Sequence, residues 1–150
     1  METLHILSVE ELDAVAIMAL GKLSKSFTEG KTPVLALSGD LGAGKTTFMQ
    51  AFAKQLHITQ SVISPTYVIM KRYDVSEDTV EIFRTLIHMD VYRIDDIGEM
   101  VPLRFGEVLA EPDTVVCIEW AEKIKELLPA HTLFMHIKIT GEHSREITFS

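Results

Sequence analysis

The chain has 150 residues, of which 47% are hydrophobic and 24% charged, a size and balance typical of one globular domain with a sizeable core. This length disfavours an enzyme with a separate substrate domain. Twenty-two acidic side chains against 14 basic ones give a formal net charge of −8, which repels phosphate backbones unless basic residues cluster on one face. The composition therefore disfavours stand-alone binding to nucleic acid.

The sequence also lacks the signals of secretion and membrane insertion. Residues 1–8 contain no basic leader and no long apolar core, and no run of 18 apolar residues occurs. A single cysteine, Cys117, excludes an intramolecular disulfide and fits a reducing compartment. No repeat, low-complexity tract or flexible linker divides the chain. We therefore expect one domain, residues 1–150, located in the cytoplasm.

The first predicted elements are a helix, a strand and a second helix. Ser8 and Glu11 have the spacing of a capping box, and the helical periodicity that follows predicts a helix over residues 9–25. The short apolar run 34–37 indicates a strand that is buried on both faces of a parallel sheet. After a glycine-rich turn, one side of a second helix is lined by Phe48, Ala51, Phe52 and Leu56. Strand, loop and helix thus follow in the order that a phosphate site requires.

Strand and helix signals alternate through the rest of the chain. Runs rich in β-branched and aromatic residues predict strands at 67–70, 80–83, 86–89 and 115–118, and a hairpin of 133–139 with 146–149. Weaker helical signals occur at 97–100, 106–109 and 121–128. Mixed strands and helices around one core indicate a three-layer α/β domain with a mixed central sheet. The glycine-rich run 39–46 makes this domain P-loop NTPase-like.

The strongest motif is the run Gly39-Asp40-Leu41-Gly42-Ala43-Gly44-Lys45-Thr46, which matches the phosphate-loop pattern G-x-x-x-x-G-K-[S/T] and is extended by Thr47. Its glycines permit the backbone N–H groups to converge on phosphate oxygens, and the following helix adds partial positive charge. We expect Lys45 to reach the β and γ phosphates and the Thr46 hydroxyl to complete the coordination of Mg²⁺. The predicted nucleotide-binding residues of the loop are Gly39, Gly42, Ala43, Gly44, Lys45, Thr46 and Thr47.

A nucleoside triphosphatase also needs an acidic side chain at the end of a neighbouring strand, to hold Mg²⁺ and to position the attacking water. Asp90 and Glu119 each end an apolar run and qualify. Four apolar residues and no histidine precede Glu119, which makes it the better candidate for the metal from the pattern alone. A solvated or salt-bridged strand end is the alternative for either residue.

Three further features are compatible with a site near the γ phosphate, and each has a structural alternative. The segment Ser64-Pro65-Thr66-Tyr67 either brings a hydroxyl to the γ phosphate or starts an ordinary turn. Trp120, the only tryptophan, is either a packing residue or a gate. Arg93 either stabilises charge on the transferred phosphoryl group or forms an ion pair at the surface. The six histidines lack paired metal spacing, which disfavours a zinc site.

Four motifs occur together in the order Gly39–Thr47, Ser64-Pro65-Thr66-Tyr67, His88-x-Asp90-x-Tyr92-Arg93 and Ile118-Glu119-Trp120. In this combination the chain resembles, over essentially its whole length, the TsaE (YjeE/YdiB) family of bacterial P-loop ATPases for threonylcarbamoyladenosine biosynthesis. The resemblance implies an ATPase that needs ATP and Mg²⁺, is weak alone and is stimulated by the proteins TsaD and TsaB. Its hydrolysis supports multiple turnover in the threonylcarbamoyl modification of adenosine 37 in tRNAs reading codons that begin with adenine. The tRNA is then held indirectly, through the complex.

The same resemblance implies roles for individual residues. Thr46 and Glu119 match the magnesium positions, and Asp90 matches the essential acidic residue, which makes Asp90 and the loop lysine the implied catalytic residues. Thr66 matches the hydroxyl of a switch-like loop in the family, and Trp120 matches the aromatic residue after the glutamate. The resemblance implies that both residues act in switching or in coupling to partners.

Three stretches depart from the family pattern. Ser144-Arg145 stands where Gly-Arg is expected, Ala121 replaces a frequent proline, and residues 76–83 align poorly. In this register, Arg145 from the C-terminal hairpin and Glu10 from the start of the first helix are expected to approach the nucleotide.

Two other functions share the phosphate loop. A small metabolite or nucleotide kinase has a similar length, but such kinases usually carry arginine-rich acceptor and lid segments, and no dense arginine cluster follows the loop in this chain. A nucleotide-gated binding module would use ATP only to set the conformation that docks on a partner. A GTPase is disfavoured because no N-K-x-D or T-K-x-D segment for reading guanine occurs.

Overall fold

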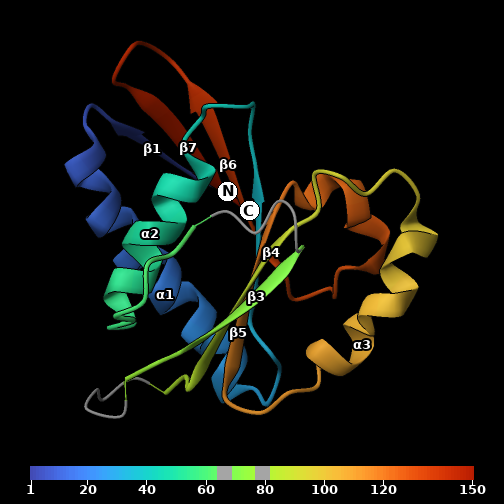
Figure 1. Cartoon of the computed structure of the whole chain (residues 1–150). Coiled ribbons are helices and arrows are strands. Elements are labelled where there is room, and N and C mark those ends of the chain that lie inside the picture. The colour runs from blue at the N-terminus through green and yellow to red at the C-terminus, as the bar shows by residue number, and fades with distance from the viewer. Residues whose placement is uncertain (64–68, 77–81) are drawn as a thin grey trace.

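A seven-stranded mixed sheet forms the centre of the computed structural model, which describes residues 1–63, 69–76 and 82–150 (Figure 1). The strands are β1 Glu2–Ile6, β2 Val34–Ser38, β3 Met70–Asp74, β4 Thr85–Asp90, β5 Thr114–Glu119, β6 Leu133–Ile139 and β7 Arg145–Phe149. Their order across the sheet is β1-β7-β6-β2-β5-β4-β3. The four central strands β6, β2, β5 and β4 run parallel, whereas β1, β7 and β3 pair antiparallel toward the two edges.

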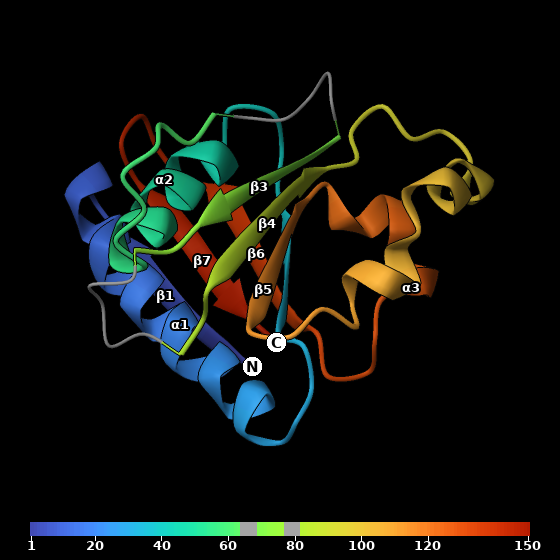
Figure 2. The ribbon, with the colours of Figure 1, turned by 60° about the horizontal axis from the view of Figure 1, so that its bottom comes forward.

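Helices cover both faces of this sheet (Figure 2). On one face lie α1 Leu12–Thr28 and α2 Lys45–Gln55, with the short 3-10 turn η1 Val9–Glu11 leading into α1. On the other face lie the 3-10 helices η2 Ile97–Leu103 and η3 Ala121–Leu127 and the single-turn α3 Phe105–Val108. The predicted three-layer α/β architecture with a mixed sheet is therefore confirmed. No helix in the described part of the chain is long and apolar enough to cross a membrane.

Successive side chains of the central strands point to opposite faces of the sheet, so the core has two halves. Leu35 and Leu37 of β2 pack on the side of α1 and α2, whereas Val34 and Ala36 pack on the side of the short helices. All four side chains are at most 1% exposed, and burying an aliphatic side chain contributes about 1.5–3 kcal/mol. The phosphate loop thus leaves a strand that is fixed from both faces, as the apolar run 34–37 predicts.

Most of the other predicted elements are also confirmed. The structure contains the helix after Ser8, the helix after the glycine-rich turn, the strands at 86–89 and 115–118, and the C-terminal hairpin. Helical segments occur near 97–100 and 106–109 as well. The helix predicted over 121–128 is a 3-10 element, broken by non-helical dihedrals at Ile124.

Several local predictions are wrong. The Ser8 side chain makes no capping hydrogen bond within the described structure, and the Glu11 carboxylate accepts instead from the Leu7 N–H at 2.6 Å. The strand β1 is absent from the prediction because a short exposed run has little pattern of its own, and its pairing is decided by β7 at the far end of the sequence.

The two remaining strand predictions fall partly outside the described residues. Of the predicted strand 67–70, residues 67 and 68 lie outside the described residues, Ile69 is not in a strand, and Met70 begins β3. Ile82 and Phe83 of the run 80–83 lie outside any strand, although the Phe83 side chain is fully buried. Burial of a large aromatic side chain is therefore not sufficient evidence of strand pairing at this position.

An ion pair ties the edge strand β3 to the turn before β5. The guanidinium group of Arg72 donates to both carboxylate oxygens of Glu111. The hydrogen bond from Arg72 lowers the pKa of the Glu111 carboxyl, and the same bond raises the pKa of Arg72.

We expect Arg72→Ala to lower the free energy of unfolding by no more than about 1 kcal/mol at neutral pH, because both side chains are partly exposed and salt screens the pair. The folded-state pKa of Glu111 lies below its unfolded value. Its contribution is therefore present above the unfolded pKa and is lost as the pH falls through the folded-state pKa. Urea titrations of both proteins at neutral and acidic pH measure the difference. If Arg72→Ala remained less stable than the wild type by the same free energy under acidic conditions, the ion pair could not be the origin of the difference.

Candidate functional site

The loop between β2 and α2 has a backbone that its glycines permit. Gly39, Gly42 and Gly44 have φ angles of +146°, +81° and +110°, where other residues are strained. A Cβ atom on Gly39 would also lie 2.5 Å from the carbonyl oxygen of Ile137 on β6. The loop leads into α2, whose amino end has no side-chain cap among the described residues. Its partial positive charge therefore remains available to an anion.

Lys45, the first residue of α2, is folded back against its own loop. Its side chain is 5% exposed, and Nζ donates to the carbonyl oxygens of Gly39 at 2.5 Å and Asp40 at 3.0 Å. Nζ also lies 4.0 Å from the centre of the Trp120 ring. Burial lowers the pKa of Lys45, and nearby carboxylates, Glu119 first among them, oppose that shift. Phosphate oxygens are stronger acceptors than neutral carbonyls, so Lys45 is placed to exchange one for the other.

Glu119, the last residue of β5, is buried and held through both carboxylate oxygens. The Thr46 hydroxyl donates to Oε1 at 3.0 Å, and Nε2 of His88 lies 2.5 Å from Oε2. Glu119 itself is only 2% exposed. The hydroxyl and the carboxylate therefore meet at the start of α2, where the sequence predicts a magnesium site.

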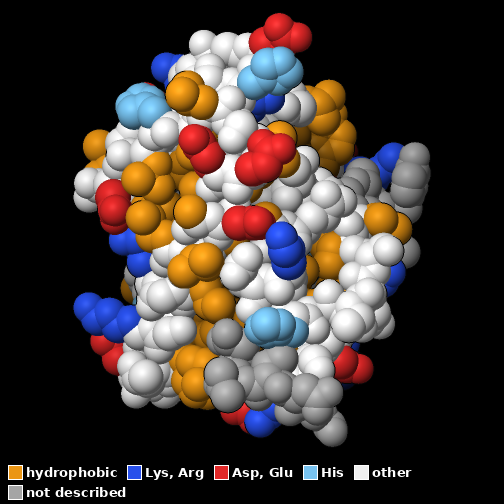
Figure 3. Space-filling model, turned by 90° about the vertical axis from the view of Figure 1, so that its left-hand side faces the viewer, with side chains coloured by type: hydrophobic (Ala, Val, Ile, Leu, Met, Phe, Trp, Pro, Cys, Tyr) orange, Lys and Arg blue, Asp and Glu red, His pale blue; other side chains and the backbone are white. Residues whose placement is uncertain are grey.

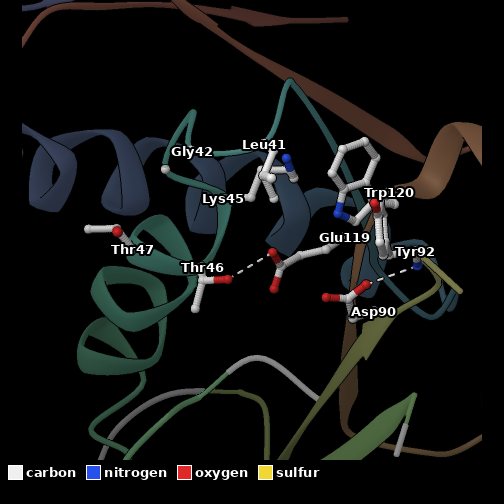
Figure 4. Close-up of a pocket in the computed structure, with 10 residues that line it drawn as sticks. Leu41, Gly42, Lys45, Thr46, Thr47, Asp90, Tyr92, Glu119 and Trp120 are labelled. Carbon is white, nitrogen blue, oxygen red and sulfur yellow. Dashed lines mark hydrogen bonds between the residues drawn. The ribbon is translucent and has the colours of Figure 1, made fainter. Parts of the chain in front are cut away.

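Asp90 lies beside Glu119 because it ends the neighbouring parallel strand. The β4–β5 register pairs the two residues directly, and side-chain alternation directs both toward the face that carries α2. Asp90 is 4% exposed, and its Oδ1 accepts from the Tyr92 N–H at 2.9 Å. Figure 4 shows Glu119 between Thr46 and Asp90. The two candidate carboxylates thus belong to one cluster.

A cavity of about 420 Å³ opens over this cluster. Its lining comprises part of the phosphate loop, the first turn of α2, the two carboxylates and the rings of Tyr92 and Trp120 (Figure 4). These two rings pack with their centroids 4.9 Å apart at an interplanar angle of 51°. The volume lies in the range of small-molecule sites. Of the predicted loop residues, those that line this cavity are Gly42, Gly44, Lys45, Thr46 and Thr47.

A second cavity of about 250 Å³ lies against the other side of the loop, toward the C-terminal hairpin. Ala43 and Arg145 line it, and Nε of Arg145 donates to the Ala43 carbonyl at 2.9 Å. Arg145 therefore ties the hairpin to the phosphate loop. Glu10 is exposed and lies outside the lining of both cavities, although its neighbour Val9 lines the second one.

The structure brings together most of the residues predicted for the phosphate end of the site. Thr66 and its segment 64–68 lie outside the described residues. Arg93 is exposed and does not line the cavity. Sequence reasoning assigned no role to His88 or Tyr92. The spacing could have indicated a role for His88, because it precedes Asp90 by two residues in one strand and therefore lies on the same face of the sheet.

We expect Gly39→Ala to reduce the free energy of unfolding by about 1–3 kcal/mol, because alanine is strained at this φ and its Cβ meets the Ile137 carbonyl. Gly21→Ala is the matched control. Gly21 lies inside α1 with no atom within 4 Å of an added Cβ, so this variant should gain up to about 1 kcal/mol. Chemical denaturation measures both values. Wild-type stability in Gly39→Ala would contradict the steric requirement.

Comparison with known proteins identifies the family. The family model described as Threonylcarbamoyl adenosine biosynthesis protein TsaE matches residues 10–147. The tRNA threonylcarbamoyladenosine biosynthesis protein TsaE of Bacillus subtilis is 44% identical over 132 residues, which cover 88% of this chain and 77% of that protein. The protein of the same name from Treponema pallidum is 34% identical over 116 residues, covering 77% and 79%. The crystal structure of Bacillus subtilis YdiB matches with a TM-score of 0.71 at 38% identity and covers 99% of this chain and 83% of its own. The chain therefore belongs to the TsaE family.

Proposed function

We propose that this chain binds ATP with Mg²⁺ at the phosphate loop and hydrolyses it, weakly alone and faster in a complex with TsaD and TsaB. The observation that carries the proposal is the buried cluster in which Lys45, Thr46, Glu119 and Asp90 meet beside one cavity. Membership of the TsaE family provides the setting, which is the biosynthesis of threonylcarbamoyladenosine in tRNA. In this setting, hydrolysis supports repeated rounds of modification at adenosine 37 of tRNAs that read codons beginning with adenine.

The donor atoms and the charge of the cluster support Mg²⁺ as the metal. Thr46 Oγ1 and Glu119 Oε1 are 3.0 Å apart, and hydroxyl and carboxylate oxygens are ligands that Mg²⁺ accepts. Two carboxylates beside a triphosphate leave an excess of negative charge that Lys45 alone does not balance. Bound Mg²⁺ neutralises charge on the β and γ phosphates. The described residues contain no group of three or more His, Cys, Asp or Glu that could hold a metal ion by itself.

Lys45 and Asp90 are the proposed catalytic residues. Lys45 exchanges its two carbonyl acceptors for phosphate oxygens and stabilises the charge that develops on the transferred group. Asp90 orients the attacking water, because its carboxylate is fixed by the Tyr92 N–H and faces the cavity next to Glu119.

The remaining site residues serve binding and coupling. Arg145 and Glu10 act at the nucleoside end, and the bond from Arg145 to the Ala43 carbonyl supports a position there for the arginine. Thr66, which lies outside the described residues, is the proposed sensor of the γ phosphate. Trp120 couples the site to partner proteins, because its ring contacts Lys45 and Tyr92 at the cavity wall.

The partners, rather than this chain, hold the tRNA. The formal net charge of −8 opposes contact with a phosphate backbone. On the face shown in Figure 3, acidic and basic side chains are interspersed and do not separate by sign. Binding of tRNA therefore depends on TsaD and TsaB.

Lys45→Ala is expected to reduce ATP turnover on the order of 100-fold or more, because it removes a cation aimed at the phosphates. Release of inorganic phosphate is measured with TsaD, TsaB and tRNA present. Lys54→Ala is the matched control, since Lys54 lies on the same helix with an exposed side chain paired to Asp13. Full turnover by Lys45→Ala would refute the site.

The same assay separates an ATPase from a small-molecule kinase. An ATPase releases the labelled γ phosphate as inorganic phosphate, with a rate that rises when the partners are added. Transfer of the label to a small acceptor, without release, would favour the kinase.

Two isosteric variants separate metal binding from water positioning. Glu119→Gln should raise the Mg²⁺ concentration needed for half-maximal ATP binding about 10- to 100-fold. Asp90→Asn should retain ATP and Mg²⁺ binding but lose turnover, because the amide is a poor partner for the attacking water. Binding is followed through the fluorescence of Trp120, the only tryptophan. The opposite pattern would make Asp90 the metal ligand.

A further inference from the structure

His88 is a fully buried polar side chain whose visible partner is the carboxylate of Glu119. Its exposed fraction is 0%, and its Nε2 lies 2.5 Å from Oε2 of Glu119. On the same face, Leu86 two residues earlier on β4 and Cys117 opposite on β5 are apolar, and Asp90 follows two residues later. A side chain that only filled this space would need no polar atoms. The imidazole therefore requires an explanation beyond packing.

The contacts of the ring define which nitrogen carries hydrogen. Nδ1 is buried and has no hydrogen-bond partner among the described residues, whereas Nε2 faces a carboxylate oxygen, which only accepts. A hydrogen on Nδ1 would be a buried donor without an acceptor. A hydrogen on Nε2 satisfies the short contact with a carboxylate oxygen, so His88 donates to Glu119.

His88 and Thr46 hold opposite oxygens of one carboxylate. Thr46 donates to Oε1 from the start of α2, and His88 donates to Oε2 from β4. The Thr46 hydroxyl is also a proposed Mg²⁺ ligand, so its geometry changes when the metal binds. The bond from His88 is made to the other carboxylate oxygen, Oε2, and would leave Oε1 to the metal. This bond could therefore hold Glu119 both with and without a metal.

We propose that His88 is a positioning residue for the metal site. Its Nε2 hydrogen bond fixes the Glu119 carboxylate so that Oε1 stays directed at Thr46 and the metal. Residues that orient metal ligands in this way typically change metal affinity by about 10- to 100-fold when they are replaced. The inference rests on the proposed function, which makes Glu119 a magnesium ligand.

Side-chain length separates positioning from packing. In glutamine the amide nitrogen stands nearly as far from Cβ as Nε2 does in histidine, so His88→Gln keeps a donor to Glu119. In asparagine the amide takes the place of Nδ1, so His88→Asn remains polar but does not reach the carboxylate. His88→Leu removes the polar atoms and fills the same space beside Leu86, and it serves as a second variant that folds without the donor.

Binding of Mn²⁺ provides a readout that does not depend on turnover. The electron paramagnetic resonance signal of free Mn²⁺ gives the Kd of the ion in the presence of saturating ADP. We expect His88→Asn and His88→Leu to raise this Kd about 10-fold or more, and His88→Gln to stay near the wild-type value. Affinity for ADP without metal, followed by Trp120 fluorescence, should be unchanged in all variants. Thermal melting of each variant identifies the folded fraction.

The outcomes distinguish this inference from the proposed function. Weakened Mn²⁺ binding in His88→Asn and His88→Leu, with rescue in His88→Gln, supports a positioning role. Equal Mn²⁺ binding in wild type and all three variants would overturn that role and leave the proposed function intact. An equal loss in His88→Gln would also overturn it, since packing would then explain the effect. Absence of ADP-dependent Mn²⁺ binding in the wild type would overturn the proposed function, and this inference with it.

Discussion

The hydrogen bond from Thr46 to Glu119 is the contact on which the arrangement of the site depends. It joins Thr46 in the first turn of α2 to Glu119 at the end of β5, 73 positions later in the sequence. It forms because β2 and β5 are parallel neighbours, so the loop after β2 and the last residue of β5 meet at one edge of the sheet. The antiparallel edge strands extend the sheet but contribute no carboxylate to this cluster. The phosphate loop and the acidic residues are therefore a consequence of the parallel centre of the sheet.

The same cluster gathers three buried ionisable side chains at one cavity. Lys45 is buried at the cost of a lowered pKa, and its ammonium group is satisfied by neutral carbonyls and the Trp120 ring. Asp90 and Glu119 are buried beside it. The proposed polyphosphate with its divalent cation would add a negative partner for the lysine and a positive partner for the carboxylates. Nucleotide and metal are thus expected to bind more tightly together than separately.

The sequence predicts the phosphate loop well, because the backbone conformation of the loop depends on residues that are close together in the sequence. Glycines at 39, 42 and 44 take the positive φ angles that the loop requires, and the apolar run before them forms the buried strand. The relation between Asp90 and Glu119 was beyond such reasoning, since it depends on the β4–β5 register. The role inferred for His88 depends on the same register. The strand β1 was missed for a similar reason, because its partner β7 lies at the other end of the chain.

The backbone at Trp120 gives the proposed stimulation by partners a physical route. Trp120 follows Glu119 directly and has φ +60° and ψ +34°, a left-handed conformation that costs a large residue of order 1 kcal/mol or more. Its ring packs on Tyr92, which is 45% exposed, and covers the ammonium group of Lys45. The Trp120 ring thus lies between the exposed ring of Tyr92 and the ammonium group of Lys45, and the Trp120 backbone is joined directly to Glu119. Trp120 is therefore the one residue that contacts both the exposed ring of Tyr92 and the ammonium group of Lys45 among the residues lining the cavity.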